Sequence, residues 1–535
     1  MGSEANSGES HILMLPFMAH GHLIPFLELA KLILRRSSVF TVTIACTPSN
    51  IQYIRSTVSA AVKIQLAELH YSSSGYNLPA NTENTENLSP EQIVTLLNSS
   101  TALELPLRQL ITDIIKKEGR PQVCIISDLF FGWSVAVARS FNVPIFNFTT
   151  CGAYGTLAYI SLWLNLPHRS TPADDFSVPG FPEGCRFHRS QLNQFVLAAD
   201  GTDSWSKFFQ PQLSSALCSD GWLCNTVEEV ESFGLRHLRD YIKIPVWAIG
   251  PLLPESTSRR WGKEKDSGVH LENCINWLNS HSKNSVLYIS FGSQNTISET
   301  QMLELAHGLE ESGKAFIWMV RPPLGHDMKA EFRADEWLPE RFEERMKERN
   351  GGLLIRNWAP QLDILSHEAV GAFLSHCGWN SMVESLSQGV PMIGWPMAAE
   401  QAYNSKMMVE EMGVGVELTR GREREIQRGK VKKMIEMVMG EGGKGEEMRK
   451  KAAIVKDKMT AAVKDYNKKD EPPKKLNPNQ PQSASSIRKG HVANEIVHTM
   501  APLTLHNSGY GHLLLHNSTT ISTPNAAQQC YFFHL

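Results

Sequence analysis

Apolar and polar positions alternate in blocks along this chain, and each block has the length of one strand or one helix. Residues 11–17 and 39–46 are almost continuously apolar, which is typical of strands buried on both faces. Between them, residues 24–36 carry apolar side chains at helical spacing and end on two arginines. A strand, a helix and a strand in this order predict the start of a doubly wound α/β domain.

The alternation stops and then restarts, which predicts a second α/β domain. Residues 246–268 are rich in proline, serine and charge, as a connection between domains would be. We predict an N-terminal domain at 1–250, a linker at 251–268 and a C-terminal domain at 269–465. Further strands are expected at 123–127, 144–149, 285–291 and 315–320, and further helices at 91–117 and 300–313.

One stretch, residues 358–401, combines two short apolar runs with a polar turn between them. The turn contains His376, Asn380 and Ser381 where a strand passes into a helix. A helix start directs free backbone N–H groups at an anion, Asn380 and Ser381 suit a cap, and His376 can donate to a phosphate oxygen. Glu384 follows one turn later, where its carboxylate can accept from two neighbouring hydroxyls. The stretch therefore predicts a site for a phosphate with a sugar on either side.

Polar residues also follow the predicted strands of the N-terminal domain. His22, Asp128 and Thr149 stand at or just beyond strand ends, where ligands of open α/β sheets bind. No G-x-G-x-x-G motif follows the first strand, so a dinucleotide cofactor is not expected there. His20 lies two residues before His22 and is a competing candidate for the same chemistry.

Composition and charge exclude several classes of function. The chain has 52 basic and 55 acidic residues, a net charge of −3, which argues against a nucleic-acid or polybasic membrane partner. The first residues lack a signal peptide, and residues 152–166 are too short an apolar segment to span a membrane. Nine scattered cysteines without a C-x-x-C pair suggest neither zinc nor a disulfide framework. We expect a cytoplasmic, monomeric protein.

The C-terminal part changes in character. Residues 430–464 are rich in Lys, Glu and Met at helical spacing, and the chain then becomes rich in Lys, Pro, Asn and Gln. We expect a disordered insertion at 466–484, a possible closing helix at 485–500 and a disordered tail without an assigned function at 501–535.

Residues 358–401 resemble the signature box of the plant family-1 UDP-sugar glycosyltransferases, with WAPQ, HCGWNS and a final Glu-Gln pair at that family's spacing over 44 residues. The resemblance covers residues 10–464. It implies an α/β GT-B fold, in which two Rossmann-like doubly wound domains face a central cleft. It also implies that Trp358 stacks on uracil, that Glu384 holds the ribose, and that the donor-binding residues are Ser293, Trp358, Ala359, Gln361, His376, Trp379, Asn380, Ser381, Glu384, Glu400 and Gln401. Trp379, Glu400 and Gln401 would hold the sugar; a final Gln is usual for glucose donors but does not exclude other sugars.

The resemblance also assigns His22 as the base and Asp128 as its partner. A neutral histidine is suited to take a proton near pH 7, and a carboxylate on its other nitrogen fixes the tautomer. No Asp-x-Asp sequence is present to hold a metal at the diphosphate, so we predict metal-independent, cofactor-free transfer with inversion. The expected reaction moves glucose from UDP-glucose to a hydroxyl of a small lipophilic plant metabolite, such as a flavonoid, another phenolic or a terpenoid. Thr149 is a candidate sugar contact, and the acceptor pocket would include Phe17, Phe130, Trp133 and Phe148.

A second hypothesis is a nucleotide-sugar-binding protein with impaired catalysis, because the C-terminus is atypical for the family. A serine hydrolase is disfavoured, since the chain has no G-x-S-x-G motif.

Overall fold

The computed structural model describes residues 10–59, 61–86, 88–118, 123–254, 271–356, 359–421 and 425–466. Trp358 and most of the predicted linker therefore lie outside the described residues. So do the predicted insertion beyond Tyr466, the possible helix at 485–500 and the tail at 501–535.

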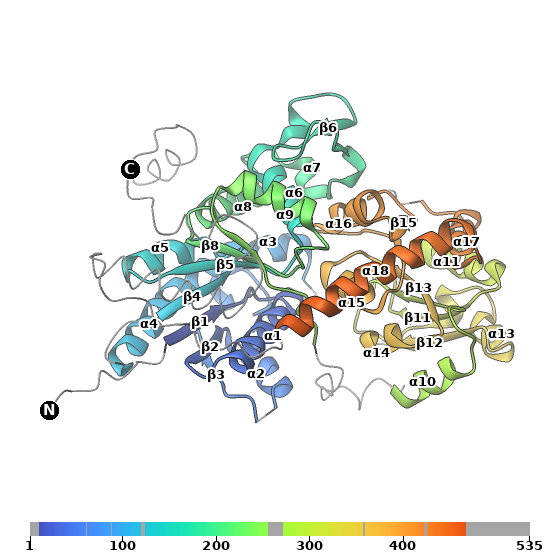
Figure 1. The fold of residues 1–535 in the computed structure, drawn as a ribbon, viewed down its shortest axis with the longest axis horizontal. Coiled ribbons are helices and arrows are strands. Elements are labelled where there is room, and N and C mark those ends of the chain that lie inside the picture. Colours follow the sequence, from blue (N-terminus) through green and yellow to red (C-terminus); the bar gives the residue numbers. More distant parts are fainter. Residues whose placement is uncertain are drawn as a thin grey trace.

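Two parallel sheets form the centre of the molecule, and they lie side by side in Figure 1. The seven strands of the N-terminal sheet follow the order β3-β2-β1-β4-β5-β8-β9, and the six strands of the C-terminal sheet follow the order β12-β11-β10-β13-β14-β15. In each sheet the strand order reverses beside the first strand, β1 or β10, which makes both sheets doubly wound. The N-terminal strands are β1 (Ser10–Leu15), β2 (Phe40–Cys46), β3 (Ile64–Glu68), β4 (Val123–Asp128), β5 (Ile145–Thr149), β8 (Gly221–Cys224) and β9 (Val246–Ala248). The C-terminal strands are β10 (Val286–Ser290), β11 (Ala315–Val320), β12 (Gly352–Arg356), β13 (Val370–Ser375), β14 (Met392–Gly394) and β15 (Gly415–Glu417).

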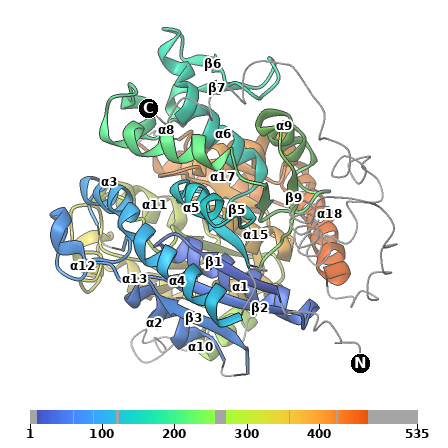
Figure 2. The ribbon, with the colours of Figure 1, turned by 90° about the vertical axis from the view of Figure 1, so that its left-hand side faces the viewer.

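Helices connect the strands of both sheets, and a small antiparallel pair, β6 (Asp175–Ser177) and β7 (Arg186–His188), lies at the top of the molecule in Figure 2. The N-terminal helices are α1 (His20–Arg36), α2 (Pro48–Thr57), α3 (Pro90–Ser99), α4 (Glu104–Glu118), α5 (Trp133–Ser140), α6 (Ala153–Asn165), α7 (Gln194–Ala198), α8 (Ser204–Ala216) and α9 (Ser232–Ile242). The C-terminal helices are α10 (Leu271–Asn279), α11 (Glu299–Ser312), α12 (Ala334–Trp337), α13 (Phe342–Glu348), α14 (Gln361–Ser366), α15 (Trp379–Gln388), α16 (Gln401–Met407), α17 (Arg428–Met439) and α18 (Gly443–Tyr466).

Two predicted helices differ from the structure. The helix expected at 24–36 begins already at His20, so that Gly21 and His22 belong to its first turn. The single helix expected at 91–117 is two helices, α3 and α4, with a 3-10 turn (Ser100–Leu103) between them. Pro106 has no N–H to donate and is tolerated in a first helical turn, which favours a new helix start there.

The last described helix connects the two domains. In Figure 1, α18 extends from the C-terminal domain toward α1 of the N-terminal domain. The ammonium group of Lys458 on α18 donates to the backbone carbonyl of Glu229 at 2.9 Å. The contact joins the end of the described chain to the N-terminal half.

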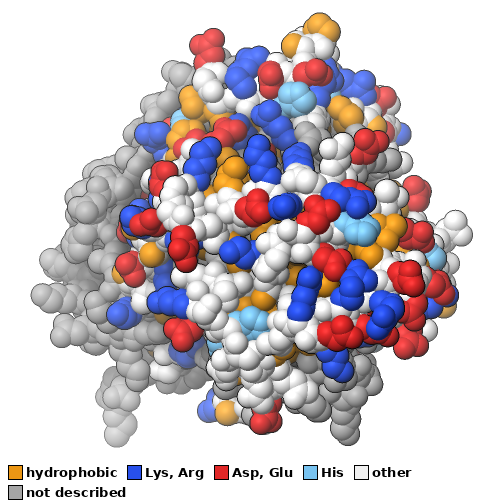
Figure 3. Space-filling model, turned by 90° about the vertical axis from the view of Figure 1, so that its right-hand side faces the viewer, with side chains coloured by type: hydrophobic (Ala, Val, Ile, Leu, Met, Phe, Trp, Pro, Cys, Tyr) orange, Lys and Arg blue, Asp and Glu red, His pale blue; other side chains and the backbone are white. Residues whose placement is uncertain are grey.

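The outer face of the C-terminal domain carries both signs of charge. In Figure 3, Lys and Arg side chains alternate with Asp and Glu over the coloured surface. Arg428 of α17 pairs with Glu304 of α11 at 2.6 Å, and Arg345 of α13 pairs with Glu310 of α11 at 2.8 Å. Opposite charges on neighbouring helices thus offset one another on this face.

Candidate active site

The first group of polar residues lies where the N-terminal sheet reverses its strand order. β1 pairs with β4 in parallel register, with Leu15 opposite Ser127. His22 follows β1 on the first turn of α1, and Asp128 is the last residue of β4. Their side chains meet at 2.7 Å between Nδ1 of His22 and Oδ2 of Asp128. The predicted pair is therefore brought together at the topological switch point, where α/β sheets bind ligands.

Asp128 is held rigidly and determines the state of the imidazole. Its carboxylate is fully buried, and its second oxygen accepts from the backbone N–H of Phe130 at 3.0 Å. A carboxylate on Nδ1 favours the tautomer that leaves Nε2 as a proton acceptor. Burial alone would lower the pKa of His22, but the charge and hydrogen bond of Asp128, and the charge of Glu400, raise it above its usual value. With 24% of its side chain exposed, His22 is accessible for proton transfer.

His20 has a different environment. Its ring stacks on Tyr53 of α2 with 4.1 Å between ring centroids. His22, by contrast, contacts the rings of Phe17 and Phe130 at 5.3 Å each. Of the two histidines, His22 has the geometry of a carboxylate-supported base.

Aromatic side chains extend from His22 into the N-terminal domain. Phe130 also contacts Tyr159 and Phe209, at 6.1 and 5.4 Å, two rings that the sequence did not single out. Trp133 packs on Phe131, with 5.5 Å between the ring centroids, and lies three residues beyond Phe130 along the chain. Phe148 is fully buried and packs on Phe26 at 4.8 Å, inside the core.

The second group lies where the C-terminal sheet reverses, between β10 and β13. His376 follows β13 and is buried, and its ring lies close to two glycines. A Cβ at Gly292, which has φ +79°, would lie 2.7 Å from Nε2 of His376, and one at Gly378 would lie 2.4 Å away. Burial and the nearby charge of Arg321 lower the pKa of His376 to about 4, so the ring is neutral at pH 7. Ser293 follows Gly292 and is exposed.

Helix α15 begins one turn beyond His376. Its N-cap is Gly378, and Trp379 is its first residue, so the expected cap at Asn380 or Ser381 is wrong. The glycine has no side chain to cap the first N–H groups of the helix. Two residues of this helix, Ser381 and Glu384, accept hydrogen bonds from Nε2 of Gln361, at 3.0 and 2.6 Å. The second bond fixes the buried carboxylate of Glu384. Ala359 is buried just before Gln361.

The residues expected to hold the sugar lie against the N-terminal domain. The indole N–H of Trp379 donates to the carbonyl of Asn225 at 2.6 Å, so its side-chain donor is already engaged. Burial raises the pKa of Glu400, whose carboxylate accepts from the backbone N–H of Trp379. The amide oxygen of Gln401 accepts from the N–H groups of Met397 and Ala398 at 2.9 Å each.

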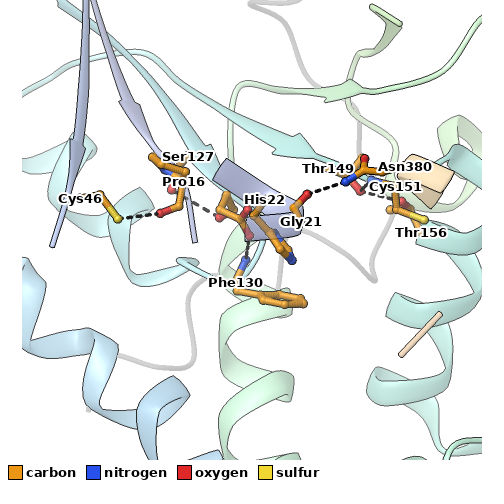
Figure 4. A network of polar contacts seen from close by, with 11 residues as sticks. Pro16, Gly21, His22, Cys46, Ser127, Phe130, Thr149, Cys151, Thr156 and Asn380 are labelled. Atoms are coloured by element: carbon orange, nitrogen blue, oxygen red, sulfur yellow. Dashed lines mark hydrogen bonds and ion pairs between the residues drawn. The ribbon is translucent and has the colours of Figure 1, made fainter. Parts of the chain in front are cut away.

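A direct bond joins the two polar groups. Pro25 has no N–H for the carbonyl of Gly21 four residues earlier, so this helical carbonyl needs another donor. Nδ2 of Asn380 donates to it at 2.9 Å across the domain boundary (Figure 4). Thr149, the candidate sugar contact, is buried and shares a hydrogen bond with Thr156 at 2.8 Å.

Three functional candidates were missed by the sequence analysis, because they act on the backbone of other segments. Glu231 is buried, and its carboxylate accepts from the N–H groups of Ala153 and Tyr154 at 3.0 Å each; burial raises its pKa to about 7. Arg321 donates to the carbonyl of Gly292 at 2.5 Å. Asn404 bonds to Cys377 in the C-terminal domain and to Cys151 in the N-terminal domain.

The comparisons with known proteins agree with this arrangement. Residues 9–254 match the family model described as the glycosyltransferase N-terminal domain, and residues 262–462 match UDP-glucoronosyl and UDP-glucosyl transferase. UDP-glycosyltransferase 92A1 of Arabidopsis thaliana is 44% identical over 468 residues, 86% of this chain and 95% of that protein. The chain belongs to the plant family-1 UDP-glycosyltransferases.

Further relatives support the same assignment. Crocetin glucosyltransferase 3 of Crocus sativus is 44% identical over 75% of this chain and 85% of its own length. The solved structure of UGT73P12 of Glycyrrhiza uralensis, complexed with glycyrrhetinic acid 3-O-monoglucuronide, has a TM-score of 0.72 at 26% identity and covers 92% of this chain and 96% of that one. The predicted GT-B fold with two Rossmann-like domains is confirmed, and this chain is a glycosyltransferase that uses a UDP-sugar donor. Within the described part of the chain, no helix is long and apolar enough to cross a membrane.

Proposed function

We propose that this glycosyltransferase moves glucose from UDP-glucose to a hydroxyl group of a small lipophilic plant metabolite, with inversion at the anomeric carbon. The observation that carries the proposal is the 2.7 Å bond between His22 and the buried Asp128. Nε2 of His22 takes the proton of the acceptor hydroxyl while the acceptor oxygen attacks the anomeric carbon. The bond from that carbon to the diphosphate breaks, and its electron pair leaves with UDP. Asp128 stabilises the imidazolium that forms.

The donor side of the proposal rests on the C-terminal group. The N–H groups of the first turn of α15 beyond Trp379 and the neutral ring of His376 would donate to the diphosphate as its charge grows. The carboxylate of Glu384, fixed by Gln361, would accept from the ribose hydroxyls. Glu400 and the amide nitrogen of Gln401 would hold the glucose. No metal takes part in these steps.

The acceptor class is inferred from the surroundings of His22. The rings of Phe17 and Phe130 contact the imidazole, which favours an apolar acceptor that presents one hydroxyl. Relatives named for flavonoid, scopoletin and crocetin glucosylation are consistent with this class.

The test is incubation of the full-length chain with UDP-glucose and a panel of phenolic and terpenoid alcohols. We expect release of UDP and a product heavier than the acceptor by one hexose unit in mass spectrometry, with the β configuration in NMR. UDP binding without turnover of any acceptor would instead favour the binding protein with impaired catalysis. Turnover of UDP-galactose or UDP-xylose in preference to UDP-glucose would overturn the donor assignment.

A further inference from the structure

Asn404 lies on α16, three residues beyond Gln401, and its side chain bonds to three different segments. It is fully buried. Its Nδ2 donates to the carbonyl of Cys377 at 3.1 Å and to Oε1 of Glu400 at 3.2 Å. Its Oδ1 accepts from the thiol of Cys151, in the N-terminal domain, at 3.6 Å. Both ends of one amide therefore have partners, on both sides of the domain boundary.

The bond to Cys377 acts on the turn that leads into α15. Cys377 has φ +62°, a left-handed conformation that side chains other than glycine rarely adopt. Such a conformation persists only where the surroundings hold it in place. By binding the Cys377 carbonyl, Asn404 holds the turn between His376 and the first residue of the helix, Trp379.

The bond to Glu400 acts on a carboxylate at the start of α16. Glu400 is the N-cap residue of α16, and it also accepts from the backbone N–H of Trp379. A half-buried carboxylate depends on fixed donors for its orientation. Asn404 supplies one of them without adding a second charge.

The N-terminal domain closes around the other end of the amide. A Cβ at Gly155 on α6 would lie 2.3 Å from Oδ1 of Asn404, so the absence of a side chain at Gly155 permits this contact. Helix α6 therefore approaches α16 closely at this point. The orientation of Asn404 depends on how α6 packs against it.

We propose that Asn404 is a positioning residue for the transferred sugar, which it serves by orienting Glu400 and by linking this carboxylate to helix α6. The inference rests on the proposed function in one respect, the assignment of Glu400 to the sugar. It predicts that the loss of Asn404 weakens the binding of UDP-glucose, while UDP, which lacks the sugar, binds as before.

The test measures the Kd of UDP and of UDP-glucose without acceptor, and kcat and KM with acceptor, for Asn404→Leu and Asn404→Asp. Leucine keeps the branched shape of asparagine without its hydrogen bonds, and we expect the binding of UDP-glucose to weaken about tenfold while the Kd of UDP changes less than about twofold. Aspartate removes the donor and places a second carboxylate at Glu400, so its effect should be larger. Equal weakening of UDP and UDP-glucose, or no change in either, would overturn the inference.

Two further variants complete the design. Ser385→Ala is the matched control, because Ser385 on α15 is fully buried and donates to the carbonyl of Val390 at 2.9 Å, away from Glu400 and Cys377; we expect wild-type affinities. Gly155→Ala displaces the Asn404 amide without changing the amide itself, and we expect the same selective loss of UDP-glucose affinity even if Asn404→Leu fails to fold.

Glu400→Ala separates this inference from the proposed function. If it leaves UDP-glucose affinity unchanged, the assignment of Glu400 to the sugar fails, and with it the proposed route. If Glu400→Ala weakens UDP-glucose but Asn404→Leu does not, only the role of Asn404 fails. We expect both to weaken it, with a double variant no worse than Glu400→Ala alone, because Asn404 acts through Glu400.

Discussion

Each domain places a histidine at the switch point of its sheet, yet the two imidazoles have opposite electrostatic environments. His22 follows β1 beside β4, and His376 lies at the end of β13 beside β10. The buried carboxylate of Asp128 and the charge of Glu400 raise the pKa of His22 against the effect of burial. Burial and Arg321 lower the pKa of His376 to about 4. The His22 ring is thus stabilised in its protonated form, whereas the His376 ring stays neutral at pH 7.

The strand order therefore sets where each histidine lies, and the neighbouring charges determine the role that its ring can take. A general base has to gain a proton in the transition state, and a carboxylate stabilises the resulting cation. A ring that contacts a diphosphate needs only to donate, and a neutral His376 would do so from one nitrogen without a change of charge. Substitutions that preserve hydrogen bonding but remove basicity should therefore separate the two sites.

The largest effect is expected at His22. Glutamine retains a polar side chain but cannot take a proton, so His22→Gln should lower kcat about 1000-fold, within the range of a positioned general base. The Kd of UDP should remain within about twofold, because the proposed UDP site lies at the other switch point. Steady-state kinetics and calorimetry with UDP measure these quantities. His20→Gln is the matched control; if it causes the loss and His22→Gln does not, His20 is the base.

A smaller effect is expected from Asp128→Asn, which keeps the shape and removes the charge. We expect kcat to fall about 100-fold, because the tautomer and the imidazolium lose their support. The pH profile should shift as well. Activity requires neutral His22 and falls as the pH drops below its pKa; without the carboxylate this pKa is lower, so the acid limb of kcat/KM moves to lower pH. An acid limb that stays in place would show that Asp128 does not set the pKa of the base.

Much of the fold and the main site residues could be predicted from the sequence, since each rests on a local pattern. Strands β2, β4 and β11 are short apolar runs, and their expected bounds agree with the structure to within one residue. The start of α1 was missed because glycine and histidine at 20–22 are typical of a turn, whereas the structure uses them as the first helical turn.

The contacts between the domains could not be predicted from these patterns. The bond from Asn380 to the Gly21 carbonyl joins residues 359 positions apart and follows from the missing N–H of Pro25, which becomes relevant only once α1 faces α15. Asn404 and Glu231 lie on helices or loops with ordinary composition, and their importance comes from the backbone groups that they meet in space. Local sequence patterns contain no information about such partners.

The smallest effect is expected at His376, and it is the strictest test of the comparison. If the ring acts as a neutral donor, His376→Gln retains a donor of similar reach and should raise the KM for UDP-glucose less than about tenfold, the value of one neutral hydrogen bond. The acid limb of the pH profile should not move, because the pKa of His376 lies near 4. His376→Ala, which removes the donor, should weaken UDP and UDP-glucose by the same factor. A kcat loss for His376→Gln as large as that of His22→Gln would contradict the division of roles, because it would mean that the C-terminal histidine also changes its charge during the reaction.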